Sequence, residues 1–185
     1  MFINEAKVST EKEGKVQELK RENMDRLASL CGPHGPHASV SITLGTTIGY
    51  GEIKIDVSVT LTCDQNEGAM DEAARIAIEK GEEYMNLGLQ AHDFAPVPFD
   101  SSKLWNMEKR PPTSPDRFRE LCSGRGPLAH IGVSSGTTIG YGDAKMKSNV
   151  RLACDQSSDG LDKAAELAIE KSNEYTRWCV LQNQV

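Results

Sequence analysis

Apolar and polar side chains alternate along two segments that flank a glycine-rich stretch. Before the stretch, the apolar residues Val40, Ile42 and Leu44 are separated by Ser and Thr. After it, apolar residues occupy every second position from Ile53 to Cys63. A period of two over this length predicts two strands with one wet face. Glycines at a tight reversal predict that the two strands form a hairpin.

The whole pattern occurs twice in the chain. The peptide Gly-Thr-Thr-Ile-Gly-Tyr-Gly begins at Gly45 and again at Gly136, an offset of 91 residues that also relates the Cys-Asp-Gln peptides at Cys63 and Cys154. The second strand pair is the weaker one, because Gly and Ser replace several apolar residues around Val133. A unit with one apolar face cannot bury that face alone, so the duplication predicts two copies closed on each other around a pseudo-twofold axis.

Each hairpin lies between two helical patterns. Short helices are predicted at 21–31 and 116–122, and longer amphipathic helices begin at Met70 and Leu161, where apolar residues recur at helical spacing up to Leu87 and Tyr175. Ile169 belongs to this apolar stripe. Acidic residues recur in both long helices and are predicted to lie on the solvated side: Asp71, Glu79, Glu83, Asp162, Glu170 and Glu174.

The predicted fold class is therefore α+β, built by tandem duplication of a helix–β-hairpin–helix unit. The two hairpins are predicted to join edge to edge or face to face in a pseudo-twofold antiparallel sheet, which the helices cover. The predicted parts are a charged N-terminal arm at 1–24, repeat 1 at 25–89, a Pro-rich connector at 90–115 and repeat 2 at 116–185. The prolines argue against a regular element in the connector. Its apolar residues predict that it is held across the fold: Phe94, Phe99, Leu104 and Trp105.

Composition narrows the possible functions. The formal net charge of -6 argues against binding of duplex nucleic acid through a strongly basic surface. No apolar run approaches membrane-spanning length, and the N-terminus does not resemble a secretory signal. Five cysteines, an odd number, indicate reduced thiols, most of them buried. We therefore expect a cytoplasmic protein without a membrane partner.

Motifs of metal and enzyme chemistry are incomplete. Cys31, His34 and His37 have metal-ligand character, but the second copy lacks the histidines, so neither a metal site nor a cofactor is expected. The glycine-rich stretch joins strand to strand, whereas phosphate loops open a helix. Cys-Asp-Gln has no histidine in register to act as a base, so we do not expect an enzyme. Asp64 and Asp155 are predicted to cap or to precede the following helices.

The strongest candidate for function is the wet face of the sheet. Aromatic rings at exposed hairpin tips can stack on bases, and outward cations can bind a phosphate backbone. The alternative for each ring is that it folds back onto its own sheet. The predicted contact set for single-stranded nucleic acid is Tyr50, Tyr141, Lys54, Lys145, Lys147 and Arg151.

A second interpretation is a protein-binding or oligomeric accessory factor, which would bind a host protein or a small signalling nucleotide. In both interpretations we expect a homo-oligomer, because free sheet edges are templates for another strand.

One repeat resembles known small proteins. The unit G-T-T-I-G-Y-G-E-I-K, followed by C-D and an amphipathic helix, resembles short phage and prokaryotic proteins of mostly unassigned role that consist of one hairpin and one helix. A pair of sheet-and-helix halves is also similar to the coactivator-type single-strand-binding domains. That similarity implies a nucleic-acid-binding sheet, and the first implies a phage accessory role.

Overall fold

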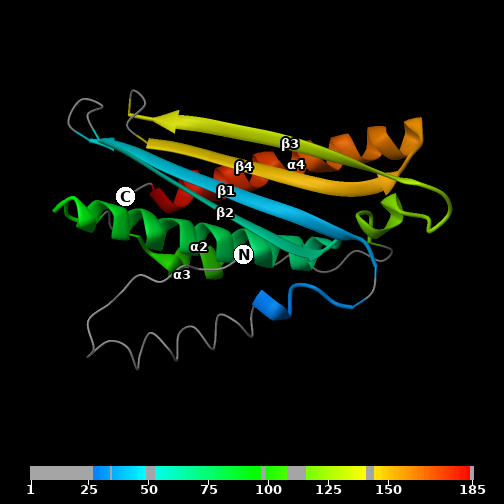
Figure 1. Ribbon diagram of the computed structural model, residues 1–185, viewed down its shortest axis with the longest axis horizontal. Helices are drawn as coiled ribbons and strands as arrows, with labels where there is room; N and C mark the ends of the chain where they lie inside the picture. Colours follow the sequence, from blue (N-terminus) through cyan, green and yellow to red (C-terminus); the bar gives the residue numbers. More distant parts are fainter. Residues whose placement is uncertain are drawn as a thin grey trace.

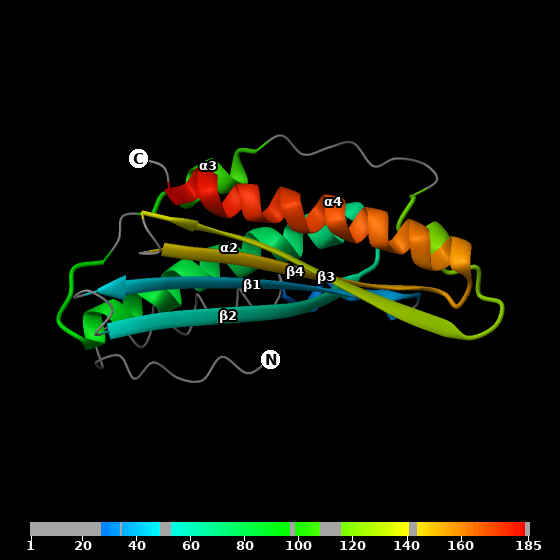
Figure 2. The same ribbon diagram turned by 90° about the horizontal axis from the view of Figure 1, so that it is seen from above.

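The computed structural model describes residues 27–33, 35–48, 53–96, 99–107, 116–140 and 144–183. Within these ranges the chain is α+β, with a four-stranded antiparallel sheet and three α-helices (Figures 1 and 2). The elements in chain order are β1 (His37–Ile48), β2 (Ile53–Asp64), α2 (Glu67–Ala91), α3 (Ser101–Trp105), the 3-10 helix η1 (Arg119–Leu121), β3 (Leu128–Ile139), β4 (Ala144–Asp155) and α4 (Ser158–Asn183).

The core lies between the sheet and the two long helices. Helix α2 packs on β1 and β2, and α4 packs on β3 and β4, so both helices cover the same face (Figure 2). The inward residues Val40, Ile42 and Leu44 of β1 are buried, as their alternation predicts. Burying each such side chain contributes about 1.5–3 kcal/mol, so this layer is the main source of stability.

The strand order corrects the predicted symmetry. The hairpins join edge to edge through an antiparallel pair between β1 and β4, and the order across the sheet is β2-β1-β4-β3. A twofold axis would place either β1 beside β3 or β2 beside β4. The observed order instead repeats by a step of two strands in one direction, and α2 and α4 begin at the same end of the sheet (Figure 1).

Asp64 precedes helix α2, as predicted, but the capping residue is Asn66. The Asn66 side chain accepts a hydrogen bond from Ala69 N, the arrangement of an N-cap. The Asp64 carboxylate instead accepts from Gly32 N at 2.8 Å, and Asp155 accepts from Ser123 N at 3.0 Å. These aspartates therefore hold the preceding loop against the end of each hairpin.

The connector contains a regular element despite its prolines. Asp100 caps the short helix α3, whose Leu104 is fully buried. Trp105 Nε1 donates a hydrogen bond to the Glu79 carboxylate of α2 at 2.7 Å. Phe94 and Phe99 also pack against the core, so the described parts of the connector are held against the fold, as these apolar residues predict.

Two further expectations change in detail, and a third concerns the second hairpin. The predicted helix at 116–122 is the single 3-10 turn η1, while much of its counterpart at 21–31 lies outside the described residues. Ile169, predicted to be on the apolar stripe, is 48% exposed. The strands of the second hairpin are 12 residues long, like those of the first, but β3 contains no fully buried residue, which agrees with its weaker alternation. No helix in the described ranges is long and apolar enough to cross a bilayer.

Candidate nucleic-acid interface

Within the described residues, one face of the sheet carries no helix, and small polar side chains dominate it. Serines and threonines occupy most outward positions of β1 and β2, and a hydroxyl network crosses between these strands. Thr60 Oγ1 donates to Ser41 Oγ at 2.9 Å, and Thr43 Oγ1 donates to Ser58 Oγ at 3.2 Å. These short side chains give this half of the face a low, hydrogen-bonding surface without large apolar groups.

Outward cations follow one another along the central strand β4. Lys145, Lys147 and Arg151 are all exposed, as is Lys54 on β2. Among the described residues, none of the four forms an ion pair with a carboxylate. Between the strand ends, the only described outward carboxylate is that of Asp56, so this face is positive although the whole chain carries -6.

The neighbours of these cations leave them open. Ser39 and Gly132 lie opposite Arg151 on either side, and Thr43 and Gly136 lie opposite Lys147. A side chain on Gly136 would approach Met146 O at 3.1 Å and the Lys147 stem at 3.4 Å, so the glycine avoids crowding against β4. The charged groups of β4 therefore project beyond the shorter side chains of the neighbouring strands β1 and β3.

A shallow hollow of about 370 Å³ lies over the middle of this face. Asn149 is at its centre, paired across the sheet with Ser41 on one side and Ser134 on the other, and its amide donates to Ser134 Oγ at 2.6 Å. The lining is entirely polar: Ser39, Ser41, Thr43, Thr60, Ser134, Lys147, Asn149 and Arg151. The arrangement offers cations at one strand and hydroxyl donors and acceptors at its neighbours.

The structure brings only part of the predicted contact set together. Lys147 and Arg151 line the hollow, and Lys145 precedes them on the same strand. Lys54 lies apart, on the edge strand beyond β1. Tyr50 and Tyr141 lie outside the described residues. The Asn149 amide and the hydroxyl groups were missed, although their outward phase in the alternation was a signal that could have found them.

The strands that lead into the two tyrosine-bearing tips end on the same side of the sheet. Thr46, near the end of β1, pairs with Ala144 at the start of β4, and Ile139 at the end of β3 also pairs with Ala144. A twofold arrangement would have placed the two tips at opposite ends. In the step-like order, β1 and β3 therefore both end where Lys54 and Lys145 lie.

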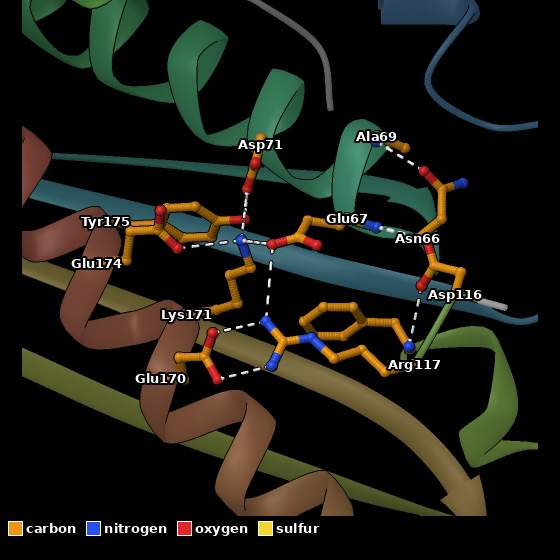
Figure 3. Close-up of polar contacts among 11 residues, drawn as sticks. Asn66, Glu67, Ala69, Asp71, Asp116, Arg117, Glu170, Lys171, Glu174 and Tyr175 are labelled. Atoms are coloured by element: carbon orange, nitrogen blue, oxygen red, sulfur yellow. Dashed lines mark hydrogen bonds and ion pairs between the residues drawn. The ribbon is translucent and has the colours of Figure 1, made fainter. Parts of the chain in front are cut away.

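A second polar cluster lies between the helices and is buried (Figure 3). The Lys171 ammonium of α4 is 0% exposed, lies 2.8 Å from Glu67 Oε1 and donates to Asp71 Oδ1 and Glu174 Oε2, both at 3.0 Å. The Tyr175 hydroxyl also donates to Asp71, at 2.8 Å. Asp71 and Glu174 are thus buried, which corrects the prediction that they are solvated.

Arg117 extends this cluster toward the surface. Its guanidinium binds both oxygens of Glu170, at 3.0 and 2.6 Å, and lies 3.7 Å from Glu67 (Figure 3). Arg117 precedes β3, whereas Glu67 opens α2. The charges therefore join the two halves of the molecule.

The electrostatics of this cluster indicate a structural role. Burial disfavours the charged form of Lys171, but Asp71, Glu67 and Glu174 outweigh that effect and raise the pKa of the amine. A nucleophilic lysine needs a lowered pKa. For Tyr175, burial disfavours the charged phenolate and raises the pKa of the hydroxyl well above its ordinary value, and Asp71 raises it further. The amine stays protonated and holds the helices together.

The thiols are also poor nucleophiles. Burial raises the pKa of Cys63 to about 12 and raises that of Cys154, while the Asp64 and Asp155 carboxylates act in the same direction. Cys63, Cys154 and Cys179 are buried as expected, whereas Cys31 is exposed. Across the described ranges, no three His, Cys, Asp or Glu side chains gather as a metal site, and His34 lies outside those ranges.

Comparisons with protein-family models, curated proteins and solved structures found no match to this chain. The resemblance to small phage proteins and to coactivator-type domains stays a prediction. The argument for function therefore depends on the geometry of the open sheet face.

Proposed function

We propose that the open face of the sheet binds single-stranded nucleic acid and that the protein is a cytoplasmic, non-enzymatic binding module. The observation that carries the proposal is the row of cations on β4, which have no carboxylate partner among the described residues. Lys145 and Arg151 are six residues apart, about 20 Å along a strand, which is enough to follow several nucleotides.

The hydroxyl-rich half of the face supports the same proposal. Ser39, Ser41 and Thr43 can donate to phosphate oxygens and to base edges, as hydroxyl groups do in many nucleic-acid complexes. Aromatic rings are absent from the described outward positions. Stacking on bases is therefore assigned to Tyr50 and Tyr141, whose flanking strands lead to the same end of the sheet.

The proposal includes that the two halves are copies of one hairpin–helix unit. His37 pairs with Asp64 in the first hairpin, and Leu128 pairs with Asp155 in the second, each 91 positions later. The exit from each hairpin is also matched, because Gln65 N donates to Pro36 O at 3.0 Å and Gln156 N donates to Pro127 O at 3.1 Å. These equivalences support duplication by a step along the sheet.

Removing two cations from β4 is expected to weaken binding and its salt dependence. We predict that Lys147→Gln/Arg151→Gln lowers the affinity for a labelled mixed-sequence single-stranded DNA. The slope of log affinity against log salt should fall by about 1.4, because each single-strand phosphate contact contributes about 0.7. Fluorescence anisotropy at several salt concentrations measures both effects.

The matched control is Lys163→Gln/Arg177→Gln, which removes the same charge from exposed positions of α4. It should leave the salt slope close to that of the wild type. Equal weakening by both double variants would contradict a specific role for the face, and absence of binding at low salt would reject the function. Competition by a mononucleotide would instead favour the small-nucleotide alternative.

A further inference from the structure

We infer that copies of this chain assemble head to tail, with the β3–α4 side of one copy joined to the β2–α2 side of the next. The template is the junction between the two halves of a single chain. The inference goes beyond nucleic-acid binding and does not depend on it.

The internal junction has three parts. The first is the β1–β4 ladder, in which Ser39 pairs with Arg151. The second is Gln65, which is 1% exposed and clamps the backbone of Ala153: Gln65 Nε2 donates to Ala153 O at 2.7 Å, and Ala153 N donates to Gln65 Oε1 at 2.8 Å. The third is the contact of Asp71 with Lys171 across the two helices.

The outer edges of the sheet can repeat the ladder. Among the described residues, β3 and β2 each have one edge without a partner strand. Because the second hairpin follows the first by a step, that edge of β3 corresponds to the edge by which β1 pairs with β4, and that edge of β2 corresponds to the edge by which β4 pairs with β1. The internal register then places His130 of one copy opposite Thr60 of the next. Val133 would face Val57, and both side chains point toward the helices.

The Gln65 clamp has an unused counterpart in the second half. Gln156 follows the same Cys-Asp peptide, but it is exposed, since no third hairpin follows β3 among the described parts of the chain. Thr62 of β2 corresponds to Ala153; its side chain is exposed, and its carbonyl accepts a hydrogen bond from Cys31 Sγ at 3.1 Å, in the place that the Gln65 amide takes at Ala153. In the proposed assembly, the Gln156 side chain clamps the Thr62 backbone of the next copy.

The contact of Asp71 with Lys171 between α2 and α4 also has equivalent residues on the two outer sides of the chain. On α2, Lys80 pairs with Glu83 at 2.9 Å, as Lys171 pairs with Glu174 at 3.0 Å on α4. Tyr84 corresponds to Tyr175, and its hydroxyl is buried without a hydrogen-bond partner among the described residues. Asp162 on α4 corresponds to Asp71, and it is exposed. In the proposed assembly, Asp162 of one copy therefore takes the place that Asp71 has within the chain, beside Lys80 and Tyr84 of the next copy.

Apolar exposure follows the same correspondence. Ile78 is fully buried, whereas its counterpart Ile169 is 48% exposed on the β3–α4 side. Trp178 is 9% exposed, whereas its counterpart Leu87 is 38% exposed on the β2–α2 side. Each outer side thus exposes an apolar residue whose equivalent in the other half is buried. The contact joins two different surfaces, so it closes into a ring or continues as a filament and does not stop at a twofold dimer.

Two variants that each disable one side test the inference. Gln156→Ala/Ile169→Arg changes the β3–α4 side, and Tyr84→Phe/Leu87→Arg changes the β2–α2 side. Leu181→Arg is the matched control, because Leu181 is 50% exposed on α4 but its counterpart Gln90 is also exposed. Sedimentation velocity over a range of protein concentrations gives the mass, and circular dichroism confirms that each variant is folded.

The wild type and Leu181→Arg should both form species larger than a dimer. Each two-site variant alone should remain a monomer, and an equimolar mixture of the two should form a heterodimer through the pair of intact sides. A monomeric wild type at all concentrations would overturn the inference. Assembly of either variant alone, or a mixture that stays monomeric, would also overturn it.

Discussion

Replacement of Lys171 by methionine is expected to destabilise the fold by about 3–5 kcal/mol, because removing one partner of a buried ion pair leaves uncompensated charge. Glu67, Asp71 and Glu174 all contact the ammonium, and solvent does not reach it. The free energy of unfolding from urea denaturation measures the effect. We expect the folded protein to persist, since methionine fills most of the same volume.

Lys163→Met is the control for this substitution. Lys163 lies on the same helix and pairs with Asp159 at 3.0 Å, but the two side chains are 65% and 80% exposed. An exposed pair of this kind contributes at most about 1 kcal/mol. Similar losses for the two variants would mean that the cluster around Lys171 does not hold the halves together.

The pH dependence of stability provides a separate check on Lys171. The folded-state pKa is raised above the ordinary value of 10.5, so the stabilisation is fully present below about pH 10.5 and is lost as the pH rises through the folded pKa. The difference in unfolding free energy between the wild type and Lys171→Met should therefore narrow at alkaline pH. A difference that stays constant up to pH 12 would argue against this linkage.

Gln65→Ala is predicted to have the second largest effect on stability. The substitution removes hydrogen bonds to Ala153 N, Ala153 O and Phe118 O. We expect a loss of about 2–4 kcal/mol, because each buried backbone group left unpaired costs about 1–3 kcal/mol. Thermal or urea unfolding of dilute protein measures it.

The matched control for Gln65→Ala is built into the repeat. Gln156→Ala changes the same position of the same motif, but in a place where the side chain is exposed. Its unfolding free energy in dilute protein should stay within about 0.5 kcal/mol of the wild type. Equal losses at both positions would show that the glutamine acts within its own half and not across the junction.

The elements were predictable from the sequence because their cause is local. The alternation at Val40, Ile42 and Leu44 has the period of a strand, and the observed strand keeps that phase. The repeated heptapeptide also gave two hairpins of equal register. The strand order was not predictable, because the edges of both hairpins can pair and the pattern of inward residues is the same in either arrangement.

The contacts at the junction between the two halves were not predictable either, for a related physical reason. Lys80 and Lys171 follow the same Ala-Ile-Glu peptide, yet only Lys171 is fully enclosed. Which copy is enclosed depends on the side of its helix that the other half occupies. Asp71 and Asp162 differ for the same reason. The outward cations of the candidate interface were predictable, because their exposure follows from the strand period alone.

Chemical-shift mapping tests the proposed interface most directly. Backbone amide spectra of the labelled protein would be recorded during titration with a short single-stranded DNA. The account predicts that the largest changes lie on the open face, at Ser39, Ser41, Lys147, Asn149 and Arg151, while amides on the solvent side of α2 and α4 stay unchanged. Changes centred on the helices, or no change at saturating DNA and low salt, would contradict it.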